Sequence, residues 1–164
     1  MHKSVKTSAA LIWLICFWSI GCAFGILIAN GKVEVLAASL QLAANRGNSL
    51  FALSALLPVL AVYLVSRLGL PGLIFPILFL KSVADSFLLM GICAAFGSAA
   101  WLAGTLFLFT DKVSTVLLLY FSGKCLTEYS RPQTARFISV LIMIAITIAV
   151  DRLCISPYFS YLML

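Results

Sequence analysis

Residues 7–30 contain no charged side chain over 24 consecutive positions, and this run constrains the fold more than any other feature. A helix needs about 20 apolar residues to cross the hydrocarbon core of a bilayer, so the run is long enough to cross. His2, Lys3 and Lys6 precede it, as in a secretory signal peptide. The apolar core of a signal peptide, however, is only ~7–15 residues long. We therefore predict a retained transmembrane helix over residues 8–29.

The rest of the chain has the same apolar character. Hydrophobic residues make up 63% of the 164 residues and charged residues only 10%, whereas soluble domains carry roughly 25% charged residues. Helices satisfy their own backbone hydrogen bonds in lipid, so we predict one all-α integral membrane domain over residues 1–164. This polytopic helical bundle would contain about five transmembrane helices and one short interfacial helix. The predicted spans are 8–29, 50–66, 73–95, 99–126 and 137–150, and the predicted interfacial helix is 32–45.

Two of these segments leave alternatives open. The segment 99–126 is longer than one crossing requires and carries polar residues 110–115 at its middle. It is either one tilted helix with a polar waist or a helix broken at the waist. Residues 32–45 are too polar and too short to span, and their apolar side chains fall on one helical face. This pattern indicates an amphipathic helix at the membrane surface, with a plain loop as the alternative.

The distribution of basic residues predicts the orientation of the bundle. With five spans, six Lys and Arg residues share the side of the N-terminus and three lie on the opposite side. Cytoplasmic loops carry the excess of positive charge, so we expect a multi-pass protein of the cell membrane with a cytoplasmic N-terminus and an external C-terminus. The net charge of +6 then reflects orientation, and we expect no nucleic-acid partner. The two sets are Lys3, Lys6, Arg67, Lys124, Arg131 and Arg136, against Lys32, Arg46 and Arg152.

Two predicted helices carry charged residues near mid-span. Lys81 and Asp85 are four positions apart and share a helix face, whereas Asp111 and Lys112 are adjacent and point about 100° apart. A short connection joins the two helices, so the four charges fall at similar depth. An isolated charge at the bilayer centre costs roughly 2.5–3.5 kcal/mol on insertion scales. We therefore predict one intramembrane network in which Lys81 pairs with Asp111, or Asp85 with Lys112, or the charges face water.

Three interpretations of this network stay open: a polar clasp between two helices, a solvated cavity for transport or proton transfer, and a lateral interface with a partner. A catalytic aspartate dyad fits poorly. A lysine beside each aspartate would hold it ionised, whereas such a dyad shares one proton. The only histidine, His2, lies in a tail, and the five cysteines form no CxxC pair. We therefore expect no catalytic residue, no metal site and no cofactor.

The first predicted helix contains GCAFG over residues 21–25. Gly21 and Gly25 have the small-xxx-small spacing that lets a second helix approach closely. We predict that these two glycines pack against another helix of the bundle. The alternative is the ordinary glycine content of membrane helices.

Three stretches carry a resemblance to a known family: IGCAFGILIAN (20–30), LGLPGLIFPILFLKSVADSFLLMGICAAFG (68–97) and ISPYFSYLML (155–164). They look like a glycine-rich end of a first helix, a turn followed by an apolar helix with a central lysine at Lys81, and a short tail with a Ser-Pro pair. On these stretches the chain resembles the stage II sporulation protein M family of spore-forming bacteria. It departs from the family at residues 110–112, where members often carry His, Pro or Glu, and in a shorter first outer loop.

The resemblance implies a non-enzymatic membrane scaffold that acts during engulfment of the forespore. It implies two partners, a membrane-anchored peptidoglycan amidase and a lytic transglycosylase, besides the membrane lipids. Homo-oligomerisation is left open. The alternative function is a small membrane transport subunit, such as the substrate-binding component of a vitamin transporter. A polar pocket opening outward would favour transport, and charges closed on each other would favour the scaffold.

Overall fold

The computed structural model describes residues 2–32, 34, 49–97, 109–128 and 133–155. Within these ranges the chain is helical and forms no strand, which confirms the all-α prediction for this part of the protein. The predicted interfacial helix 32–45 and the first half of the segment 99–126 fall largely outside the described residues. The long helices are α1 (His2–Ala29), α3 (Ser49–Arg67), α4 (Ile74–Phe96), α6 (Phe109–Thr127) and α7 (Thr134–Val150).

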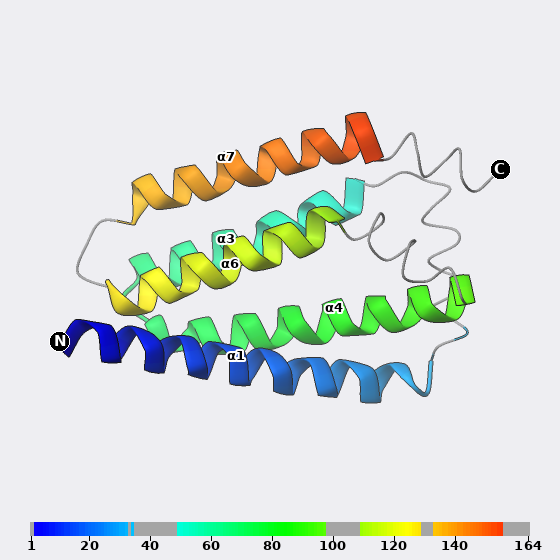
Figure 1. Ribbon diagram of the computed structural model, residues 1–164, viewed down its shortest axis with the longest axis horizontal. Coiled ribbons are helices and arrows are strands. Elements are labelled where there is room, and N and C mark those ends of the chain that lie inside the picture. Colours follow the sequence, from blue (N-terminus) through cyan, green and yellow to red (C-terminus); the bar gives the residue numbers. More distant parts are fainter. Residues whose placement is uncertain (1, 33, 35–48, 98–108, 129–132, 156–164) are drawn as a thin grey trace.

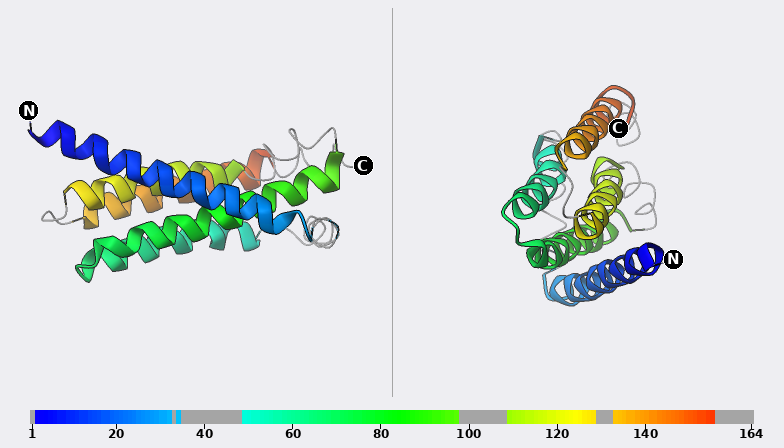
Figure 2. Two further views of the ribbon diagram at one scale, coloured as in Figure 1. Left: turned by 90° about the horizontal axis from the view of Figure 1, so that it is seen from below. Right: turned by 90° about the vertical axis from the view of Figure 1, so that its left-hand side faces the viewer.

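These helices lie side by side and alternate in direction along the chain (Figure 1). α1, α4 and α7 run one way, and α3 and α6 run the other way. α1 packs along α4 and also contacts α6, while α6 additionally contacts α3 and α7 (Figure 2). The backbones of α4 and α6 approach each other little, so side chains must bridge these two helices.

The turn between α3 and α4 is a helix-ending motif centred on Gly69. The Leu70 N–H donates to the Val65 carbonyl and the Gly69 N–H donates to the Ser66 carbonyl, which is the hydrogen-bond pattern of a Schellman motif. Gly69 has a φ of 80°, a left-handed conformation that glycine adopts at little cost. Pro71 then begins a short 3-10 helix, Pro71–Leu73, that leads directly into α4. The tight turn predicted over these residues is therefore confirmed.

Apolar side chains lie both between the helices and on the outside of the bundle. By length and composition, three helical segments can cross a membrane: Ala9–Ala29, Pro71–Ala94 and Thr134–Cys154. Much of their surface is exposed apolar side chain, as expected of helices that face lipid. These findings are compatible with a multi-pass membrane protein. The interior between the helices is filled by Leu14, Ala55, Val59, Val62, Ile74, Leu78, Leu118, Phe121, Cys125, Val140 and Ile144.

α7 is followed by a π-helical turn over Asp151–Ile155. The fifth predicted span ended at residue 150, and the helical conformation thus continues beyond it by this wider turn. At the other end of α7, Tyr63 of α3 stacks on Phe137, with ring centroids 4.0 Å apart and an interplanar angle of 11°. This aromatic pair joins α3 and α7 near the end where α3 finishes and α7 starts.

Candidate functional site

Two glycines of α1 bring its backbone against α4. A Cβ atom built on Gly21 would overlap the Ser82 hydroxyl and lie 2.8 Å from the Phe79 carbonyl oxygen. A Cβ on Gly25 would lie 2.5 Å from the Val83 carbonyl oxygen. Any larger side chain at these positions would push the helices apart. Gly21 and Gly25 therefore lie at a helix contact of the kind that the small-xxx-small spacing predicts.

α4 places Lys81 and Asp85 inside the bundle, and α6 places Asp111 opposite them. The Lys81 ammonium donates to Asp85 Oδ1 and to Asp111 Oδ1, the latter at 2.5 Å. The three side chains are only 6%, 2% and 1% exposed, in that order. We refer to these three residues as the buried ion cluster. It contains one of the two cross-helix pairings that the depth of the charges predicts.

Hydroxyl groups of α6 complete the surroundings of the buried ion cluster. Thr115 Oγ1 lies 3.2 Å from Asp85 Oδ2 and 2.9 Å from the Asp111 carbonyl oxygen, so its single proton has two acceptors. Ser114 Oγ donates to the same Asp111 carbonyl at 2.8 Å. Hydrogen bonds to ionised groups are stronger than neutral ones. The cluster thus joins α4 to α6 by an ion pair and by the bond from Thr115 to Asp85.

Lys112 does not join the other three predicted site residues. Its side chain is exposed, whereas Asp111 beside it is buried. Adjacent residues of an α-helix point about 100° apart, so turning Asp111 inward directs Lys112 away from α4. The ion pairs described for the buried carboxylates involve Lys81, and the pairing of Asp85 with Lys112 is not among them.

The chemistry of the cluster follows from its closure. The ammonium of Lys81 lies against two carboxylates, and almost none of the three side chains is accessible from outside. Removing one member of a buried ion pair leaves an uncompensated charge and typically costs about 3–5 kcal/mol. This arrangement is suited to fixing α4 relative to α6, and it leaves little of either carboxylate accessible to a solute.

A second polar cluster closes the connection from α6 to α7, and the sequence analysis did not find it. Arg136 Nη2 donates to Glu128 Oε2 at 2.5 Å, and Lys124 Nζ lies 3.4 Å from Glu128 Oε1. Gln133 Nε2 donates to the Glu128 carbonyl oxygen at 2.8 Å. The hydrogen bond from Arg136 lowers the pKa of Glu128 below its ordinary value of 4.5. Only the i,i+4 spacing of Lys124 and Glu128 could have indicated part of this cluster from sequence.

Comparison with protein-family models, with curated proteins and with solved structures finds no match to the chain. Function is therefore inferred from the geometry of the chain and from the three stretches quoted above. Of the predicted site residues, Lys81, Asp85 and Asp111 meet in one cluster, Gly21 and Gly25 meet α4, and Lys112 lies apart.

Proposed function

We propose that this chain is a non-enzymatic membrane scaffold of five spans, with a cytoplasmic N-terminus and an external C-terminus. Its resemblance to the stage II sporulation protein M family suggests the role: it positions a membrane-anchored peptidoglycan amidase and a lytic transglycosylase during engulfment of the forespore. The proposed spans are α1, α3, α4, α6 and α7, whose alternating directions suit a chain that crosses five times.

The observation that supports a scaffold best is the closure of the buried ion cluster. A transport subunit needs a polar site that a solute can reach. Here the ammonium of Lys81 is held between Asp85 and Asp111, and the three side chains are almost fully covered. The charges are thus closed on each other, as expected of a clasp that holds the helices of a rigid membrane platform.

Partner capture in the native host tests this proposal. The full-length tagged chain is crosslinked in sporulating cells, solubilised in mild detergent and purified, and the bound proteins are identified by mass spectrometry. We expect the amidase and the transglycosylase to be recovered. A Gly25→Ala variant, which disturbs the contact between α1 and α4, should recover less of both, and Gly31→Ala should match the wild type, because a Cβ at Gly31 meets open space.

Two results would overturn the scaffold proposal. The first is saturable binding or uptake of a small solute by the purified protein in proteoliposomes, lost in Asp85→Asn. The second is normal engulfment in cells that lack the chain. The first result would favour the transport subunit, and the second would remove the role in engulfment while leaving the fold unaffected.

A further inference from the structure

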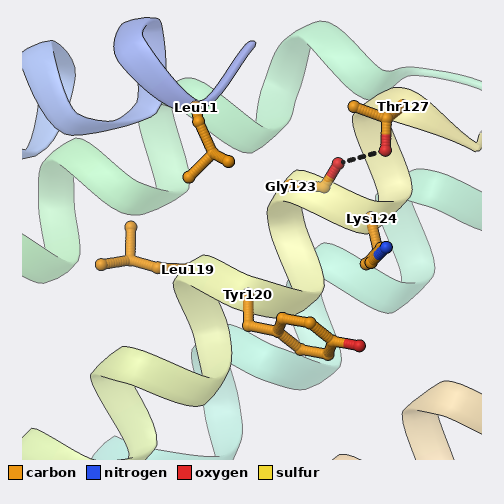
Figure 3. A pocket seen from close by; sticks show the side chains of 6 residues that line it. All are labelled: Leu11, Leu119, Tyr120, Gly123, Lys124 and Thr127. Atoms are coloured by element: carbon orange, nitrogen blue, oxygen red, sulfur yellow. Dashed lines mark hydrogen bonds between the residues drawn. The ribbon is translucent and has the colours of Figure 1, made fainter. Parts of the chain in front are cut away.

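A groove lies between the N-terminal part of α1 and the C-terminal part of α6 (Figure 3). Its volume is about 180 Å³. Gly123 lines it without a side chain, between the apolar side chains of Leu11 and Leu119 on one side and Lys124 and Thr127 on the other (Figure 3). Tyr120 also lines it. The groove is therefore apolar at one end and polar at the other.

The size and position of the groove restrict its occupant. Pockets for free small molecules measure about 300–1,000 Å³, so this groove suits one segment of a longer molecule. Leu11 is 44% exposed and Tyr120 is 56% exposed, which opens the groove to the outside of the bundle. Leu11 lies two residues inside the apolar segment Ala9–Ala29, close to its end. The groove therefore opens to lipid near one boundary of the membrane.

The charge at the polar end favours an anion. Lys124 has three N–H donors, and its described contacts are loose: Glu128 Oε1 at 3.4 Å and the Tyr120 ring centroid at 6.0 Å. Glu128 meanwhile accepts a shorter bond, 2.5 Å, from Arg136. These two cations and one carboxylate leave one positive charge at this end of the groove. Basic pockets between transmembrane helices commonly bind anionic lipid headgroups.

We propose that this groove is a binding site for an anionic phospholipid. One acyl chain lies along Leu11 and Leu119 and over Gly123, and the headgroup phosphate accepts a hydrogen bond from the ammonium of Lys124. The hydroxyl groups of Thr127 and Tyr120 lie at the headgroup level, where Tyr is enriched in membrane proteins. This inference depends on the membrane location of the helices and is independent of the scaffold role.

Native mass spectrometry of the full chain tests the site. The protein is purified in non-ionic detergent and offered equal amounts of phosphatidylglycerol and phosphatidylcholine. We expect retention of one phosphatidylglycerol with a preference of about five-fold, the factor that corresponds to roughly 1 kcal/mol for one lysine near the headgroups. Lys124→Gln should still bind one lipid but lose this preference. Lys32→Gln, which removes an exposed lysine beyond the other end of α1, should keep it.

Two further variants test the groove itself. Gly123→Leu should lower retention of both lipids, because its side chain fills the space of the acyl chain. If Gly123→Leu fails to fold, Gly123→Ala serves instead, since its Cβ would lie 3.8 Å from Leu14 Cδ1, an ordinary contact. Equal retention of both lipids by the wild type would overturn the proposal, as would an equal loss of preference in Lys32→Gln. Efficient disulfide crosslinking of two copies through Leu119→Cys in membranes would show a protein interface instead.

Discussion

Lys81 of α4 and Asp111 of α6 are 30 positions apart in sequence, and their charged groups meet at 2.5 Å inside the bundle. The backbones of the two helices approach each other little, so this ion pair is a main link between them. Asp85 shares the same ammonium. The position of α6 relative to α4 thus depends on polar contacts in an otherwise apolar interior.

The contact between α1 and α4 should tolerate no added methyl group at Gly25. In Gly25→Ala the Cβ would lie 2.5 Å from the Val83 carbonyl oxygen, and overpacking of this kind typically costs about 1–3 kcal/mol. Chemical unfolding of the purified protein in detergent measures the loss. Gly31→Ala is the matched control, because its Cβ meets no atom within 4 Å. Equal stability of the two variants would show that α1 does not approach α4 at Gly25.

The connection between α6 and α7 should weaken in acid through Glu128. Arg136 holds the pKa of Glu128 below its ordinary value of 4.5. A carboxyl group whose pKa is lower in the folded state stabilises the fold above its unfolded pKa, and this contribution disappears as pH falls through the folded pKa. We therefore expect Glu128→Gln to unfold at a lower temperature than the wild type at pH 7. The difference should shrink as the pH falls below the ordinary pKa, and a difference independent of pH would contradict this role.

The stacked pair of Tyr63 and Phe137 should couple α3 to α7 energetically. Aromatic pairs contribute about 0.5–1.5 kcal/mol beyond the area that they bury. A double-mutant cycle with Tyr63→Leu and Phe137→Leu measures this coupling. Tyr63→Phe is the control: it keeps the ring and removes only the hydroxyl, which lies 3.5 Å from Thr134 Oγ1. Strictly additive losses from the two leucine substitutions would mean that the rings do not interact.

The alternating helix directions predict that the two chain termini lie on opposite sides of the membrane. α1 begins at one end of the bundle and α7 finishes at the other (Figure 1). With the basic residues concentrated on the N-terminal side, a reporter that is active only in the cytoplasm should be active when fused before residue 1. The same reporter should be silent when fused after residue 164. Activity at both termini would require an even number of spans.

Much of the fold follows from the lengths of the apolar runs. The predicted end of the first span, residue 29, is the last residue of α1, and Gly69 and Pro71 mark the turn before α4. The start of α1 was harder to predict. The polar residues before the apolar run suggested a tail, whereas α1 already begins at His2. A helix can continue through polar residues where it leaves the membrane, and hydropathy does not report this extension.

The candidate site could be predicted in part because depth in the membrane is readable from sequence. Matching depths across a turn brought Lys81 and Asp111 together. Rotation about the helix axis is not readable in the same way, so the sequence did not show which of Asp111 and Lys112 faces inward. The groove around Gly123 and the contact between Glu128 and Arg136 depend on how neighbouring helices pack, which apolar patterns alone do not specify.

Neutralising the buried ion cluster stepwise tests most directly whether it is a closed clasp. Lys81→Met leaves two buried carboxylates without their ammonium and should cost about 3–5 kcal/mol of unfolding free energy. The triple variant Lys81→Met, Asp85→Asn and Asp111→Asn removes all three charges, so it should regain most of that loss. Lys112→Met should have little effect, because its side chain is exposed.

The measurement is the unfolding free energy of these variants and the wild type in one detergent. A clasp predicts strong coupling, with the triple variant clearly more stable than Lys81→Met. If Lys81→Met and the triple variant lose the same amount, or neither loses any, the charges are not coupled. That result would contradict the clasp and would place these side chains along a water-filled path.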